Sequence, residues 1–119
     1  MSGNLTLGRL GENASASYLR ANGYKIIDRN VKLGIGEVDI IAYKGSILYI
    51  FEVKTRKNTK SGNPYEAVDK RKAHKLILMG EKYSLQNNLK HSKLSLGVIS
   101  ILVDETNKVC SIKIYDYFL

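Results

Sequence analysis

Residues 47–56, ILYIFEVKTR, constrain the fold most, because they alternate like a strand that is buried on both faces where it begins. One face is apolar throughout and consists of Ile47, Tyr49, Phe51 and Val53. The other face starts with Leu48 and Ile50 and then changes to Glu52, Lys54 and Arg56. The apolar start shows that this second face is covered by other parts of the chain. The charged end is therefore expected at the edge of a core, where a cleft can form.

Periodicity and turn signals divide the remaining sequence into two helices and four more strands. The helices are expected over residues 6–22 and 63–85, and Asn63, Pro64 and Glu66 suit the N-cap, first and third positions of the second helix. The strands are expected over residues 24–32, 37–43, 96–103 and 109–115. The order α-β-β-β-α-β-β predicts one α/β domain over residues 1–119 with a mixed sheet.

Composition and charge narrow the class of protein. The chain has 119 residues, a formal net charge of +8 and one cysteine, Cys110, so an internal disulfide is excluded. No apolar run approaches the length of a membrane span, and no secretory signal begins the sequence. These features predict a cytoplasmic protein without a membrane partner. The positive charge indicates an anionic partner, of which nucleic acid is the commonest.

The hairpin between the second and third expected strands is predicted to bring carboxylates together. If residues 44–45 form a two-residue turn, Glu37 faces Glu52 and Asp39 lies diagonal to it. A loop longer by two residues places Asp39 directly opposite Glu52 instead. In both registers Asp39, Glu52 and Lys54 share one face of the sheet, and the Cβ atoms of the facing acids lie about 5–8 Å apart.

Carboxylates this close repel each other, and two interpretations account for the pair. Asp39, Glu52 and Lys54 form either a charged cluster on a solvated sheet face, which would contribute little energy, or half of a metal site. Hard oxygen ligands on adjacent strands suit Mg or Mn, with water completing the octahedron. Such an ion would polarise a phosphodiester and activate water. Lys54 would then orient that water or stabilise the developing charge.

The chain resembles the YraN-type family of predicted endonucleases in three segments, GRLGENASASYLRANGYKIIDRNVK, GEVDIIAYKGSILYIFEVKTRK and EAVDKRKAHKL. That family resembles a branch of the restriction-endonuclease-like superfamily, whose signature is PD-(D/E)xK, and its layout is similar to that of archaeal Holliday junction resolvases. The resemblance implies a restriction-endonuclease-like α-β-β-β-α-β core with a mixed sheet flanked by helices. It also implies a metal-dependent endonuclease that acts on DNA rather than RNA, on branched or structured forms, and as a homodimer.

Site residues follow from the resemblance position by position. It implies that Asp39 and Glu52 are the principal metal ligands, with the main-chain carbonyl of Val53 as an additional ligand. Lys54 matches the catalytic lysine. Glu12, in LGEN, matches an acidic residue that the first helix of such nucleases directs toward the metal, although a glutamate near a helix start is also favoured by the helix dipole alone.

Two further positions bear on activity. Glu37, in GEVD, matches a family position and is expected beside the metal ligands or near the substrate. Gly97 stands where the family usually has an aspartate. If that aspartate helps to position the site, this chain has lost its help. The alternative is therefore a nucleic-acid-binding module that keeps the fold without cleaving, or a basic structural partner in a larger complex.

Basic residues follow directly on the proposed site and are expected to hold a nucleic-acid backbone, unless they only form a solvated surface. They are Arg56, Lys57, Lys60, Lys70, Arg71 and Lys72. Lys72 is distinctive because it falls within the apolar stripe of the second helix, four residues from Val68 and four from Leu76. Its ammonium group is expected either to extend outward to solvent or to reach the cleft.

Overall fold

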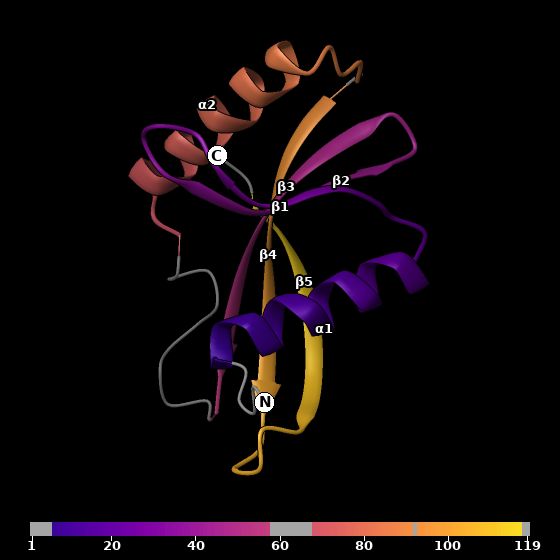
Figure 1. The fold of residues 1–119 in the computed structure, drawn as a ribbon, viewed down its shortest axis with the longest axis vertical. Helices are drawn as coiled ribbons and strands as arrows, with labels where there is room; N and C mark the ends of the chain where they lie inside the picture. Colours follow the sequence, from indigo (N-terminus) through magenta and orange to yellow (C-terminus); the bar gives the residue numbers. More distant parts are fainter. Residues whose placement is uncertain (1–5, 58–67, 92, 118–119) are drawn as a thin grey trace, which may run out of the picture.

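The computed structural model describes residues 6–57, 68–91 and 93–117, which form a five-stranded sheet with one helix on each face (Figure 1). The elements in chain order are α1 (Leu7–Ala21), β1 (Lys25–Lys32), β2 (Glu37–Lys44), β3 (Ile47–Arg56), α2 (Lys70–Gln86), β4 (Lys93–Val103) and β5 (Val109–Tyr117). The strands lie in the order β1-β2-β3-β4-β5. Only β3 and β4 run parallel among these neighbours. The predicted α/β class, the restriction-endonuclease-like element order and the mixed sheet are confirmed.

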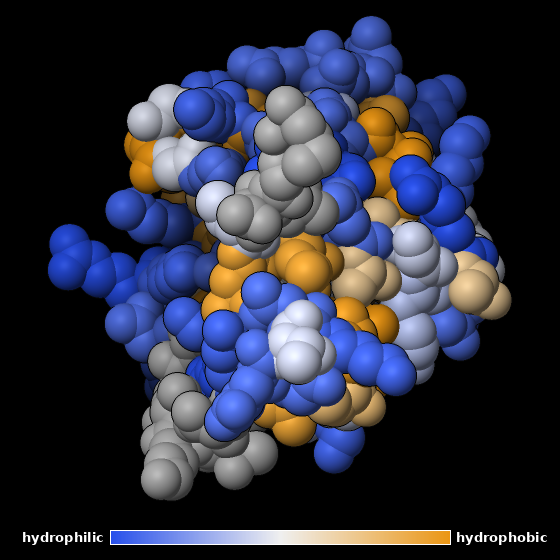
Figure 2. Space-filling view, turned by 60° about the horizontal axis from the view of Figure 1, so that its bottom comes forward, coloured by the Kyte–Doolittle hydropathy of each residue, from blue (hydrophilic) through white to orange (hydrophobic). Residues whose placement is uncertain are grey.

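Each face of the sheet has its own apolar core, because a helix covers each face. Leu48 and Ile50 of β3 pack with residues of α2, whereas Phe51 packs in the second cluster with Leu19 of α1. All three β3 side chains are fully buried, as the alternation of that strand predicts. Hydrophilic residues cover most of the face shown in Figure 2. Neither described helix is both long enough and apolar enough to cross a bilayer.

The second helix starts later than the sequence indicates. Asp69 is its N-cap, with an extended backbone and a side chain that accepts a hydrogen bond from the Lys72 N–H at 2.8 Å. The expected capping residues Asn63, Pro64 and Glu66 lie outside the described residues. A helix running unbroken from residue 63 is nevertheless wrong, because Val68 and Asp69 are not helical.

The β2–β3 turn decides between the two registers that the sequence allows. Lys44 pairs with Ile47, so Gly45 and Ser46 form the turn rather than residues 44–45. Gly45 has a φ of +61°, a left-handed conformation that glycine adopts without steric cost. This register is the one in which Asp39 would face Glu52 if the ladder continued beyond its last pair, Ile40–Phe51.

Helix α1 approaches β3 so closely that only glycine fits at one position. A Cβ atom on Gly11 would lie 1.7 Å from the Thr55 Oγ1 atom, whereas a Cβ on Gly8 would meet nothing within 4 Å. Glu12 follows Gly11 directly. The close contact therefore fixes where α1 presents this carboxylate to the sheet.

We predict that Gly11→Ala lowers the free energy of unfolding by about 1–3 kcal/mol, because the added methyl group overlaps Thr55 and forces α1 away from β3. Gly8→Ala, in the same helix, should leave stability unchanged or raise it by up to about 1 kcal/mol through helix propensity. Urea denaturation followed by circular dichroism measures both. Equal stability of the two variants would contradict the proposed close contact.

Candidate active site

Asp39 lies where the sheet loses its regular pairing. The β2–β3 ladder ends at the Ile40–Phe51 pair, and beyond it the Val53 N–H donates to the Asp39 Oδ2 atom at 2.8 Å. The β1–β2 ladder also omits the position opposite Asp39, where Asn30 has a left-handed φ of +54°. The Asp39 carboxylate therefore occupies a position in which a main-chain acceptor would otherwise lie.

Glu52 is the second carboxylate of the site and is held from the α2 side of the sheet. Its side chain is only 14% exposed, and its Oε2 atom lies 2.5 Å from the Lys72 Nζ atom. The Lys72 ammonium group extends to the Glu52 carboxylate although 46% of its side chain is exposed, and the pair satisfies the charge of Glu52. Contact between Lys72 and a phosphate stays a prediction.

Glu12 reaches the site region from the other face, through α1. Its Oε1 atom lies 3.9 Å from the Arg29 Nη2 atom, and the same Nη2 atom donates to the Asn13 Oδ1 atom at 2.7 Å. No local sequence pattern marks Arg29, because a strand arginine that meets a preceding helix has no characteristic spacing. Arg29 connects Glu12 and Asn13 of α1 to β1.

The surroundings of Asp39 disfavour its charged form. Burial raises the pKa of this carboxyl, the hydrogen bond from Val53 opposes the shift, and the carboxylates of Glu52, Glu12 and Glu37 raise the pKa further, to about 7. Glu37, at the start of β2, therefore lies close enough to act on Asp39 electrostatically. Because these acids share one region, a cation bound between them would relieve their repulsion.

The donor atoms suit a small hard cation that keeps most of its water. Among residues 6–57, 68–91 and 93–117, no three His, Cys, Asp or Glu side chains are grouped closely enough to bind a metal by themselves. Mg²⁺ is commonly held by one or two carboxylates plus water and substrate phosphate, a pattern that Asp39 and Glu52 match. The Val53 carbonyl faces the same side as its N–H, toward Asp39. These residues therefore fit the expected ion.

The predicted basic residues divide into three groups. Lys54 is exposed two positions beyond Glu52 on β3, and it forms no ion pair with any residue in the described ranges. Arg71 and Lys72 line a cavity beside the site together with Glu37 and Lys75. Of the remaining residues, Lys57 and Lys70 are exposed, Arg56 is half-buried at the end of β3, and Lys60 lies outside the described residues.

Gly97 does not lie on the face that carries Glu52. It pairs with Phe51, and a Cβ atom at this position would lie 2.7 Å from the Phe51 ring. An aspartate there would point toward the α1 side of the sheet, away from Glu52. Residues 97 and 52 therefore face opposite sides of the sheet, and the expectation that the missing aspartate helps to position the site or the helix stays a prediction.

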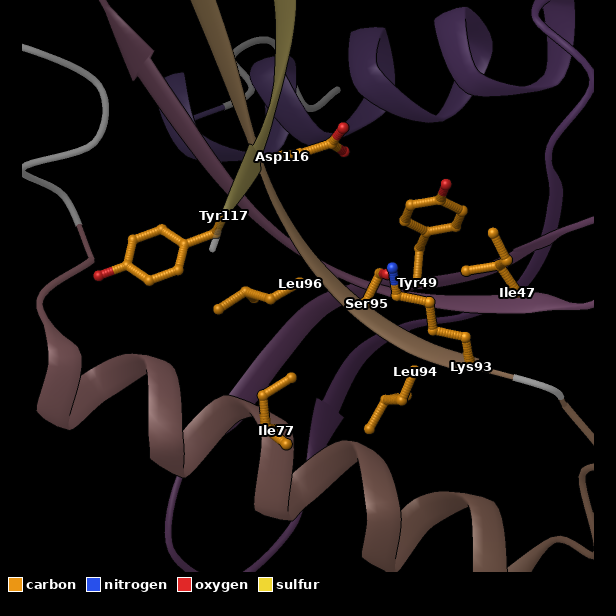
Figure 3. Close-up of a pocket in the computed structure, with 9 residues that line it drawn as sticks. All are labelled: Ile47, Tyr49, Ile77, Lys93, Leu94, Ser95, Leu96, Asp116 and Tyr117. Carbon is orange, nitrogen blue, oxygen red and sulfur yellow. The ribbon is translucent and has the colours of Figure 1, made fainter. Parts of the chain in front are cut away.

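A second cavity, of about 320 Å³, lies at the opposite end of β3 (Figure 3). Ile47 and Tyr49 at the start of β3 form part of its wall, and Ile77 of α2 contributes from the helix side. Its charged lining residues are Lys93 and Asp116. With one carboxylate and one ammonium group, this cavity lacks the converging acids of the Asp39 region.

We predict that the metal-free protein loses stability as the pH rises from about 4 to about 7. In this window the folded state retains the Asp39 proton, whose pKa is about 7, while the unfolded chain releases it near the ordinary value of 3.8. Asp39→Asn should flatten the fall. Denaturant titrations in EDTA across this pH range measure the slope.

Asp104→Asn is the matched control. Hydrogen bonds from Thr106 and Lys108 lower the pKa of Asp104, so this group titrates below the window and its replacement should preserve the slope. An unchanged slope in Asp39→Asn would show that Asp39 ionises in the folded protein as it does in the unfolded chain.

Comparison with known proteins places the chain in a family. Residues 11–101 match the model of the uncharacterised protein family UPF0102. The UPF0102 protein of Dictyoglomus thermophilum is 39% identical, covering 89% of this chain and 90% of the relative. The UPF0102 protein of Alkaliphilus metalliredigens is 36% identical over 87% of this chain and 91% of the relative. A solved structure, an fdxN element excision controlling factor protein from Anabaena variabilis, aligns at 14% identity and a TM-score of 0.43, covering 87% of this chain and 98% of that chain. The chain belongs to the UPF0102 family, as its sequence resemblance predicts.

Proposed function

We propose that this protein is an Mg- or Mn-dependent endonuclease that hydrolyses phosphodiester bonds of DNA, with branched or structured DNA as its substrate. The observation that supports the proposal is the position of Asp39 at the end of the β2–β3 ladder, where its carboxylate accepts a hydrogen bond from the Val53 N–H and lies close enough to Glu52 for that carboxylate to raise its pKa. When bound, a divalent ion supplies a Lewis acid for the phosphate and lowers the pKa of water.

The chain's own residues have separate tasks in this proposal. Asp39 and Glu52 hold the ion, and the hydrogen bond from Val53 fixes the orientation of the Asp39 carboxylate. Lys54 is exposed and carries no ion pair with a described residue, so its ammonium group can donate to the attacking water or to a phosphate oxygen. Arg71 and Lys72 lie beside these groups and provide positive charge for the DNA backbone.

A second candidate function is nucleic-acid binding without cleavage. The observation that favours it is the Lys72–Glu52 ion pair, which satisfies Glu52 without a metal. In that case Lys72 would act as a permanent counter-ion, and the basic residues of α2 would bind the backbone alone. The two candidates differ in what happens to DNA after binding.

We predict metal-dependent cleavage that Glu52→Gln abolishes. The wild-type protein is incubated with four-way junction, flap, single-stranded and duplex DNA, with Mg²⁺, with Mn²⁺ and with EDTA, and products are resolved on denaturing gels. Loss of one metal-ligand carboxylate should reduce the rate by at least about 100-fold, since positioned ions and charge stabilisation contribute several kcal/mol to such reactions.

Glu105→Gln serves as the matched control, because Glu105 is exposed in the β4–β5 connection, away from the carboxylates. It should cleave like the wild type. Salt-sensitive DNA binding without metal-dependent products in any protein would support the binding module and overturn the endonuclease.

We also predict that Lys72→Ala binds Mn²⁺ about 1.4- to fivefold more tightly, because the ammonium group that competes for Glu52 is gone and such pairs contribute about 0.2–1 kcal/mol. Lys75→Ala is the control, since Lys75 also belongs to α2 but forms no ion pair with Glu52. Isothermal titration calorimetry without DNA measures the affinity. Weaker Mn²⁺ binding in Lys72→Ala would mean that Lys72 supports the metal site rather than competing with it.

A further inference from the structure

A cavity of about 330 Å³ lies between parts of the β1–β2 connection and of α2. Residues 35–37 form one wall, and side chains between Asp69 and Met79 form the other. Its volume falls at the lower end of the range for small-molecule pockets, about 300–1,000 Å³. The charged end of β3 predicts a cleft near Glu52, but nothing in the sequence indicates this cavity or its apolar wall.

The inner wall of the cavity is apolar. Leu76 and Met79 of α2 line it, opposite Ile35 and Gly36 of the connection. A Cβ atom on Gly36 would lie 3.3 Å from the Met79 Cε atom, so the connection packs directly against the helix. Ile35 is nevertheless 55% exposed, which leaves a large apolar side chain at the cavity mouth.

The rim of the cavity is positively charged. Arg71, Lys72 and Lys75 line it, against the two carboxylates of Glu37 and Asp69. The Asp69 carboxylate caps α2 by accepting a hydrogen bond from the Lys72 N–H, which partly compensates its negative charge. An anion with an apolar or aromatic body is the ligand that this combination of wall and rim fits.

The cavity adjoins the carboxylates of the candidate active site. Lys72 belongs to both, because it lines the cavity and its Nζ atom contacts Glu52. Glu37 likewise lines the cavity and raises the pKa of Asp39. A group bound in the cavity would therefore lie beside a phosphate held at Asp39 and Glu52.

We propose that this cavity receives one unpaired nucleotide of a DNA strand, adjacent to the phosphate that is cut. The proposal rests on the proposed endonuclease function and specifies its substrate. The base packs against Ile35, the exposed apolar side chain at the cavity mouth, and its phosphate is neutralised by Arg71 and Lys75.

This assignment predicts that a branched or flapped substrate is preferred over a continuous duplex. A paired base must be unstacked before it can enter a side pocket, at an energetic cost that an already unpaired base avoids. The cavity therefore selects DNA in which the nucleotide next to the scissile phosphate is already free. No base-specific hydrogen bonding is required, because every base offers a stacking face.

The test measures binding in EDTA, where cleavage plays no part. Fluorescent DNA hairpins carry no overhang, a one-nucleotide overhang, or an abasic one-nucleotide overhang that keeps the phosphate, at the 5′ or the 3′ end. The hairpin fixes the register, so the comparison isolates one base. We expect the base-bearing overhang of one polarity to bind about five- to 150-fold more tightly than its abasic counterpart, the range for one stacked base.

Two exposed apolar residues supply the variants. Ile35→Ser should remove the difference between base-bearing and abasic overhangs, whereas Leu78→Ser, at a 58% exposed leucine of α2 outside the cavity, should preserve it. Equal binding of base-bearing and abasic overhangs by the wild type, in both polarities, would overturn the pocket proposal, as would failure to bind any hairpin.

The outcome is separable from that of the endonuclease proposal. Base-dependent binding without metal-dependent cleavage of any substrate would support the pocket and overturn the enzyme. Cleavage by a protein that binds abasic and base-bearing overhangs equally would support the enzyme and overturn the pocket.

Discussion

The hydrogen bond between the Val53 N–H and the Asp39 carboxylate determines the geometry of the whole site. A regular antiparallel ladder would fill this position with a main-chain carbonyl and leave Asp39 pointing away from the strand. Here a side chain is the acceptor, so the strands separate without leaving a buried donor unsatisfied. The separation creates the space in which Asp39 and Glu52 face each other.

The two helices, which lie on opposite faces of the sheet, each contribute a charged side chain near this space. Helix α2 brings Lys72 to Glu52, and Glu12 of α1 is paired with Arg29 of β1. Burial and the neighbouring carboxylates raise the pKa of Asp39, and the hydrogen bond from the Val53 N–H opposes this shift. Both cations are partly exposed, so solvent screens the two pairs and each contributes modestly to stability.

Much of this arrangement could be predicted from the sequence, because it follows from alternation and helical spacing. Asp39 and Glu52 share a face of the sheet when the numbers of two paired residues in the hairpin add up to an odd value. Both turns that the sequence allows give an odd sum. The register itself could not be predicted, because either turn suits the residues KGS. Similarly, Lys72 is recognisable within an apolar stripe, but its partner comes from a strand 20 residues earlier.

Other features depend on tertiary contacts that no local pattern encodes. Asn63 and Asp69 are both good helix caps, so propensity alone could not choose between them. In the sequence, Gly97 stands where the family usually has an aspartate, but on β4 this position faces Phe51. Arg29 was missed because its partners on α1 lie 16 and 17 positions away and share no motif with it.

The left-handed conformation of Asn30 changes the directions in which the neighbouring side chains of β1 point. Residues 29 and 31 of a regular strand would face the same side, but Arg29 contacts α1 while Val31 packs with the cluster beneath α2. The left-handed residue between them reverses the alternation. Position 30 is thereby restricted to Asn, Asp or Gly, the residues that tolerate this conformation. An exposed side chain that performs no chemistry is thus constrained by backbone conformation alone, because its neighbours Arg29 and Val31 reach opposite faces of the sheet.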